Sequence, residues 1–261
     1  MIVERGIVFA EKDGYRFLEL DVSRPADQDA PLPVLHQIHG GGWRVSHRDR
    51  APRETRAWTP SFFERMVAAG FVVVASSYRF SGEALYPAAV EDSLDAVRWI
   101  RANIADHGGD PTRQVLFGQS AGGYLAAAVG LSREIDPVDG VICWYPLTDP
   151  GAIADDDPAA DFPRQWLGAP LSTIPAITAD ASLPARAHGA APPFLIQHGT
   201  ADTIAPVEQG RRLHESLLAA GGTSMLEPID GAEHFFGGCD DATVVDLFDR
   251  AMQFARACVT A

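Results

Sequence analysis

The chain has 261 residues, a length that suits one α/β domain with a sizeable core and leaves little for a second domain. Its formal net charge is −14, with 21 Lys and Arg residues against 35 Asp and Glu residues. Nucleic acids and anionic membranes are bound by basic patches, so this balance predicts neither partner and favours a small neutral substrate.

The three cysteines and the hydropathy pattern bear on where in the cell the protein is located. Three cysteines cannot all pair, and Cys143 lies in the apolar run 141–144, where a reduced buried thiol is common. The first residues lack the apolar core of a signal peptide, and no run of 18 apolar residues occurs. We therefore expect a cytoplasmic protein without a membrane span. The sequence allows a homodimer.

Strand and helix patterns alternate along the chain. The expected strands span residues 3–9, 15–22, 33–38, 71–75, 115–117, 138–144, 194–197 and 225–229. The expected helices span residues 61–70, 87–107, 124–129, 207–220 and 241–257. This alternation predicts an α/β fold with a doubly wound, mainly parallel sheet of about eight strands in a single domain, residues 1–261. The Asp13-Gly14 turn signal predicts an antiparallel N-terminal edge.

Two helices carry informative polar residues. Ser61 and Glu64 form the pattern of a capping box at the start of a helix that ends at Gly70. Asp92 lies within the helix expected at 87–107. Catalytic groups of open α/β sheets come from the carboxyl ends of strands, so we interpret Asp92 as a solvated or capping residue.

A glycine-rich loop, His39-Gly40-Gly41-Gly42-Trp43, follows the strand expected at 33–38. Glycines allow backbone N–H groups to approach a ligand closely. A tetrahedral acyl intermediate needs fixed donors about 3 Å from its oxyanion. Gly41 and Gly42 are predicted to supply two such donors, and we assign Trp43 to substrate binding.

A second motif, Gly118-Gln119-Ser120-Ala121-Gly122, lies between an apolar run and a helix-compatible run. In a strand–turn–helix context this G-x-S-x-G pattern predicts a nucleophile elbow, in which Ser120 occupies a strained turn and projects its hydroxyl above the sheet. The N–H of Ala121 would be a third donor to the oxyanion.

The two motifs together resemble those of the α/β-hydrolase family, in particular small esterases of the hormone-sensitive-lipase-like type. The resemblance covers nearly the whole chain, through the segments 77–79, 86–92, 110–111 and 198–202. It implies hydrolysis of carboxylic esters through an acyl-enzyme intermediate. One departure is Gln119, where similar members often carry Glu or Asp.

The nucleophile requires a base and an acid. In this fold class the acid and then the histidine follow the serine, which leaves His188, His198, His214 and His234 as candidates for the base. We favour His234 because it lies in a loop after the last strand, whereas His214 lies inside an expected helix and His198 ends an expected strand. For the acid we favour Asp202, which follows the strand at 194–197 and stands where the resembling family has its acid. Asp230 and Glu233 are closer in sequence to His234 but are not favoured.

Metal and cofactor chemistry is not expected. His36 and His39 are three residues apart, so a strand would direct them to opposite faces. The sequence contains no H-E-x-x-H pattern, no paired-cysteine spacing and no G-x-G-x-x-G fingerprint.

Periodicity fades between Leu147 and Pro193, and we expect a lid-like excursion at about 147–193 that contains short helices. This excursion and the charged segment 44–60 are polar with scattered aromatic residues, which predicts a preference for short acyl groups. An aryl formamidase with the same triad is the alternative activity. A further alternative is a protein that keeps this fold and binds a ligand but has lost turnover.

Overall fold

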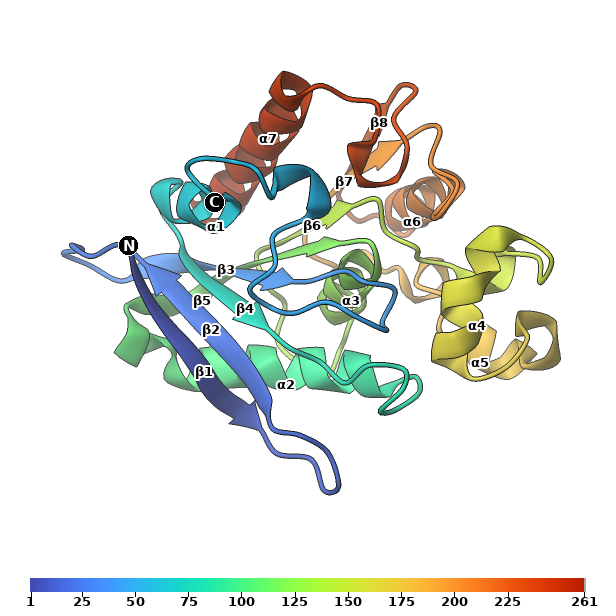
Figure 1. The fold of residues 1–261 in the computed structure, drawn as a ribbon, viewed down its shortest axis with the longest axis horizontal. Coiled ribbons are helices and arrows are strands. Elements are labelled where there is room, and N and C mark those ends of the chain that lie inside the picture. The colour runs from blue at the N-terminus through green and yellow to red at the C-terminus, as the bar shows by residue number, and fades with distance from the viewer. Residues whose placement is uncertain (261) are drawn as a thin grey trace.

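Residues 1–260 are described by a computed structural model, in which eight strands form one sheet in the order β1-β2-β4-β3-β5-β6-β7-β8 (Figure 1). The strands are β1 (Ile2–Ala10), β2 (Leu18–Arg24), β3 (Leu32–Ile38), β4 (Val72–Ser76), β5 (Gly109–Gln119), β6 (Gly140–Trp144), β7 (Phe194–Gly199) and β8 (Ser224–Ile229). Strand β2 pairs antiparallel with β1 and β4, and every other pairing is parallel. The predicted fold, with its antiparallel N-terminal edge, is confirmed.

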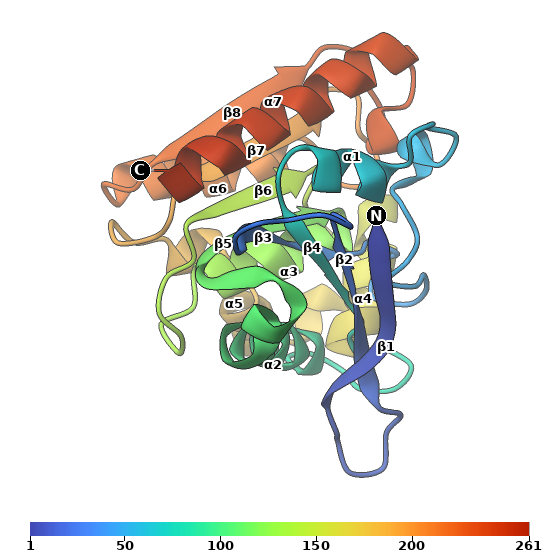
Figure 2. The same ribbon diagram turned by 90° about the vertical axis from the view of Figure 1, so that its left-hand side faces the viewer.

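Helices cover both faces of the sheet (Figure 2). The helices that pack on these faces are α1 (Phe62–Ala68), α2 (Ala88–Asn103), α3 (Ala121–Gly130), α6 (Glu208–Ala219) and α7 (Asp241–Thr260). Successive side chains of a strand point to opposite faces. On β5, Leu116 therefore packs in the cluster with α2, α3 and α6, whereas Val115 and Phe117 pack in the cluster with α1 and α7. The sheet is doubly wound, as predicted.

Between β6 and β7 the chain forms two short helices, α4 (Asp161–Leu167) and α5 (Pro175–Asp180), which lie beyond the sheet in Figure 1. The indole of Trp166 is fully buried and stacks on that of Trp43, with ring centroids 4.2 Å apart. The ring of Tyr124, from α3, meets Trp166 edge-on at 4.9 Å. The expectation of scattered aromatic residues is therefore wrong for Trp43 and Trp166, because these rings join the excursion at 147–193 to the glycine-rich loop and α3 in one apolar cluster. Trp58 packs in the other cluster, with Phe62 and Phe248.

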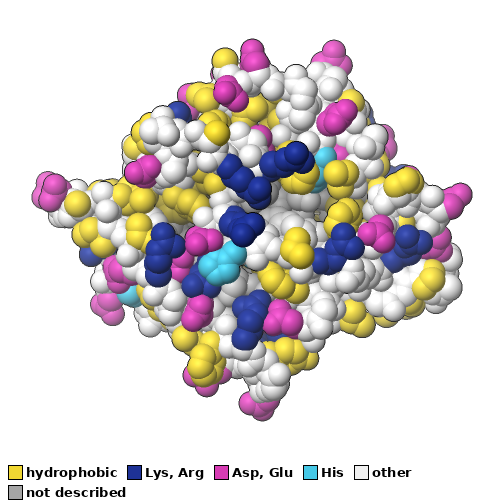
Figure 3. Space-filling view, viewed as in Figure 1, with side chains coloured by type: hydrophobic (Ala, Val, Ile, Leu, Met, Phe, Trp, Pro, Cys, Tyr) yellow, Lys and Arg dark blue, Asp and Glu magenta, His cyan; other side chains and the backbone are white. Residues whose placement is uncertain are grey.

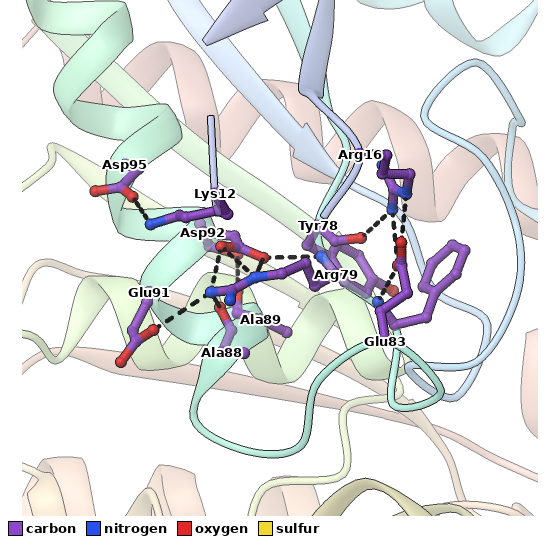
Figure 4. Close-up of polar contacts among 12 residues, drawn as sticks. Lys12, Arg16, Tyr78, Arg79, Glu83, Ala88, Ala89, Glu91, Asp92 and Asp95 are labelled. Atoms are coloured by element: carbon purple, nitrogen blue, oxygen red, sulfur yellow. Dashed lines mark hydrogen bonds and ion pairs between the residues drawn. The ribbon is translucent and has the colours of Figure 1, made fainter. Parts of the chain in front are cut away.

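Asp92, on α2, is completely buried and pairs with Arg79 (Figure 4). The guanidinium of Arg79 lies 2.8 Å from the carboxylate, which also accepts the backbone N–H of Arg79 at 2.8 Å. The interpretation of Asp92 as a solvated or capping residue is therefore wrong. The pair fixes the segment after β4, where the hydroxyl of Tyr78 donates to the carbonyl oxygen of His39 at 3.0 Å. Asp92 thus supports the glycine-rich loop indirectly.

Asp92→Asn is expected to lower the free energy of unfolding by about 3 kcal/mol, because it leaves the buried guanidinium of Arg79 without its main counter-charge. Urea denaturation measures this change. Asp95→Asn on the same helix is the control, since Asp95 pairs with Lys12 near the surface and should cost at most about 1 kcal/mol. Equal losses in the two variants would contradict the structural role of Asp92.

Candidate active site

Ser120 lies in a sharp turn between β5 and α3, with φ 54° and ψ −121°. A non-glycine residue rarely adopts a positive φ, so the surrounding structure must hold it there. Close packing does this: a Cβ at Gly122 would collide with the carbonyl oxygen of Ile38, and one at Gly118 would collide with that of Gly122. The two glycines of the motif are therefore required by close backbone approach, as the elbow prediction assumed.

The glycine-rich loop lies beside this turn. Gly41 has a φ of +117°, and a Cβ there would collide with the carbonyl oxygen of Val45. Within residues 1–260, the N–H groups of Gly41 and Gly42 donate no hydrogen bond, and that of Ala121 has no acceptor in the first turn of α3. These N–H groups are available to bind an oxyanion.

The structure brings Ser120, Asp202 and His234 together from the ends of β5, β7 and β8. The Nε2 atom of His234 lies 3.0 Å from the hydroxyl oxygen of Ser120. The Nδ1 atom of His234 lies 2.7 Å from a carboxylate oxygen of Asp202. In contrast, Asp230 contacts the hydroxyl of Thr200 at 3.4 Å. The geometry is that of a hydrogen-bonded nucleophile, base and acid.

Asp202 is held ionised by its surroundings. Burial raises its pKa, but contacts with the rings of His198 and His234 and with the N–H of Ala205 outweigh that effect and lower the pKa to about 2. The ring of His198 is fully buried, with Nε2 3.4 Å from the carboxylate. In the sequence His198 is a candidate only for the base, and no local pattern indicates this supporting contact with Asp202. An ionised Asp202 keeps the proton of His234 on Nδ1.

Tyr145 and Glu54 form a second buried contact next to the base, which the sequence did not predict. The ring of Tyr145 lies 4.7 Å from that of His234, and its hydroxyl donates to a carboxylate oxygen of Glu54 at 2.5 Å. Burial raises the pKa of Glu54 to about 7, although the hydrogen bond from Tyr145 opposes this shift. Glu54 thereby joins the segment 44–60 to the wall of the site.

A cavity of about 340 Å³ opens next to Ser120. Its apolar wall includes Leu147, Phe162 and Ile204. Trp43 also lines it, but only 1 % of this residue is exposed because its indole stacks on Trp166. Trp43 therefore contributes to the wall of the cavity and presents no free ring face to a ligand.

The structure also bears on metal binding and on membrane-spanning helices. Within residues 1–260, no group of three or more His, Cys, Asp or Glu side chains is placed to hold a metal ion. His36 instead contacts the hydroxyl of Ser76 at 2.7 Å, and burial lowers its pKa to about 3. No helix in this part of the chain has the length and apolarity needed to cross a membrane.

The BD-FAE family model matches residues 20–217. The chain belongs to the BD-FAE family. Among curated proteins it is 33% identical to Esterase LipC of Mycobacterium tuberculosis, over 85% of this chain and 58% of that protein. It is 36% identical to Carboxylesterase NlhH of the same species, over 52% of this chain and 41% of that protein. The chain spans about half the length of these relatives.

Two solved structures that are similar to this chain are also esterases. Est2, a thermophilic esterase from Thermogutta terrifontis, is 27% identical with a TM-score of 0.73, and the match covers 97% of this chain and 91% of Est2. A truncated carbohydrate esterase from gut microbiota is 23% identical with a TM-score of 0.83, over 100% of this chain and 97% of that one, which shows a shared fold. The resemblance to esterases of the α/β-hydrolase family is confirmed.

Asp202→Asn is expected to lower kcat by roughly 10⁴-fold, because an amide favours the wrong tautomer of the His234 imidazole. Steady-state kinetics on a chromogenic ester measures the loss. Asp230→Asn is the matched control and should retain near-normal kcat. If the Asp230 variant lost more activity than the Asp202 variant, the assignment of the acid would be wrong.

Glu54→Gln is expected to change how stability depends on pH. The pKa of Glu54 is about 7 in the folded state against an ordinary value of 4.5, so the folded state retains a proton that the unfolded state releases between these values. Wild-type stability therefore falls as pH rises from about 4.5 to 7. The variant lacks this loss and should gain roughly 1–3 kcal/mol relative to wild type between pH 5 and pH 8.

Urea denaturation at the two pH values tests this expectation. Glu215→Gln, which removes an exposed carboxylate from α6, is the control and should show no such gain. A difference between Glu54→Gln and wild type that stays constant with pH would show that Glu54 does not titrate in this range.

Proposed function

We propose that this protein is a serine hydrolase that cleaves short-acyl carboxylic esters through an acyl-enzyme intermediate. The observation that carries the proposal is the hydrogen-bonded chain from Ser120 through His234 to Asp202, with contacts of 3.0 and 2.7 Å. Gly41 and Gly42, whose N–H groups donate no hydrogen bond within residues 1–260, line the same cavity as Ser120. The names of the relatives, which are esterases and carboxylesterases, support the same reaction.

In the proposed mechanism the hydroxyl oxygen of Ser120 attacks the ester carbonyl carbon while Nε2 of His234 takes the hydroxyl proton. The ionised Asp202 stabilises the imidazolium that forms. Nearby backbone N–H groups bind the oxyanion of the tetrahedral intermediate. His234 then returns the proton to the leaving alcohol. Water repeats the same steps on the acyl group and regenerates Ser120.

The size of the cavity supports a short acyl group. At about 340 Å³ it is near the lower end of the range for small-molecule sites, and Phe162 and Leu147 are among the apolar residues that line it. Each methylene that it buries contributes about 0.8 kcal/mol, so affinity should stop rising once the chain outgrows this space. Acetyl to butyryl groups fit this description.

The proposed compartment is the cytoplasm. Cys143, Cys239 and Cys258 are all free thiols in the structure, and Cys143 is buried. Reduced thiols are the normal state in the cytoplasm, whereas oxidising compartments favour disulfides. Cell fractionation with an antibody against the protein tests this part of the proposal.

Ser120→Ala and a series of p-nitrophenyl esters from acetyl to decanoyl test the proposed reaction together. Wild-type kcat/KM should reach its maximum at or before butyryl, and Ser120→Ala should lower kcat by about 10⁶-fold, because the triad acts as a unit. A serine-directed phosphonate should inactivate the wild type.

More than a few per cent activity in the pure Ser120 variant would refute the mechanism, and a steady rise of kcat/KM through decanoyl would refute the acyl preference. Faster turnover of a paired aryl formamide would assign an amidase.

A further inference from the structure

A second cavity, of about 250 Å³, also opens on Ser120 and is bordered by the segment 44–60. Three of its lining residues are Arg50, Arg53 and Arg56, and none of its lining residues is acidic. We call this space the arginine cavity. Figure 3 shows Lys and Arg side chains gathered around the hollow at the centre of this face of the molecule. The cavity therefore places positive charge next to the nucleophile.

These arginines differ from most others in the chain. Arg16 and Arg48, for example, each lie within 3.0 Å of a carboxylate oxygen. Within residues 1–260, Arg50, Arg53 and Arg56 have no carboxylate within ion-pair distance, although the chain has 35 Asp and Glu residues. Acidic residues are plentiful in this chain, so arginines on a surface that only keeps the protein soluble are expected to pair with them. Three neighbouring arginines without such a partner therefore indicate another role.

Two of the guanidinium groups make local contacts at the edge of the cavity. That of Arg53 lies 5.7 Å from the ring centroid of Phe235, the neighbour of His234 in sequence. Nε of Arg56 donates to the carbonyl oxygen of Ala51 at 3.3 Å, which leaves its other N–H groups free of this bond. Both contacts are with uncharged groups, so they do not neutralise the positive charges of Arg53 and Arg56.

Glu54 is the carboxyl group nearest to these arginines in sequence. Burial raises its pKa and outweighs the charges of Arg56 and Arg53, which lower it, and Glu54 forms no ion pair with either within residues 1–260. It accepts a hydrogen bond from the hydroxyl of Tyr145 at 2.5 Å and is not one of the residues that line the cavity. Its second carboxylate oxygen is buried and forms no hydrogen bond within residues 1–260. The cavity thus keeps its positive character at the surface that a ligand would meet.

We propose that the arginine cavity binds an anionic group of the substrate, so that the preferred ester carries a carboxylate near its scissile bond. Guanidinium groups bind carboxylates through paired, charge-assisted hydrogen bonds. A bound carboxylate would also relieve the mutual repulsion of the three arginines. This inference rests on the proposed ester hydrolysis and replaces the neutral substrate expected from net charge.

The carboxylate belongs to either the acyl or the alcohol part of the ester, and two pairs of substrates distinguish these cases. Monoethyl succinate and ethyl 4-methylpentanoate place a charged or a neutral group of similar shape on the acyl side. 4-Acetoxybenzoate and 4-acetoxybenzamide do so on the alcohol side. For each pair, the ratio of kcat/KM for the anionic ester to that for the neutral ester is measured in wild type and in variants.

Arg50→Gln, Arg53→Gln and Arg56→Gln should each lower this ratio by about 2- to 5-fold in one of the two pairs, which is the range for partly exposed ion pairs. The triple variant should lower it by about 10-fold or more. High salt should reduce the wild-type ratio in the same pair, since it screens the attraction. Arg133→Gln is the matched control, because Arg133 is exposed, lies in the loop after α3 and does not line the cavity. It should change neither ratio.

The outcomes separate the two proposals. An unchanged ratio in both pairs for the triple variant, with normal wild-type hydrolysis of the neutral esters, overturns the anionic-substrate inference and leaves the esterase proposal intact. Failure of wild type to hydrolyse any of the four esters, together with the p-nitrophenyl series, overturns both.

Discussion

The close backbone contact between the turn at Ser120 and the end of β3 is the constraint on which the site depends. Gly122 lies so near to the carbonyl oxygen of Ile38 that any side chain at this position would collide with it. This contact places the first turn of α3 against the glycine-rich loop, and Gly41, Gly42 and Ala121 line the same cavity as Ser120. The strained φ of Ser120 persists because the packing leaves it no alternative.

A second set of contacts keeps the glycine-rich loop in place from the other side. The buried pair of Arg79 and Asp92 fixes the segment that carries Tyr78, and the hydroxyl of Tyr78 donates to the carbonyl oxygen of His39. The loop is therefore held between a helix and a strand end before any ligand binds. Preorganised donors of this kind stabilise an oxyanion without reorganisation during the reaction, which is the usual source of their effect.

The sequence predicts the parts of this structure that depend on local pattern. Strand and helix periodicity predicts the sheet, and the two glycine motifs predict the elbow and its neighbouring loop because close backbone approach requires glycine at fixed positions. Contacts between distant residues could not be predicted this way. Helical spacing gives no sign that Asp92 is buried with Arg79, and nothing local to Trp43 indicates that it stacks on Trp166.

The arginine cavity illustrates the same limit for electrostatics. Net charge is a sum over the whole chain, but at physiological ionic strength the Debye length is about 8 Å, so most of the 35 acidic residues do not act on a group bound beside Ser120. The potential there depends on side chains within a few ångströms, and Arg50, Arg53 and Arg56 are the charged residues that line the space. A net charge of −14 is therefore compatible with local attraction for an anion. The proposed charge of the substrate follows from the side chains that surround the nucleophile, and only the fold brings the arginines of the segment 50–56 next to Ser120.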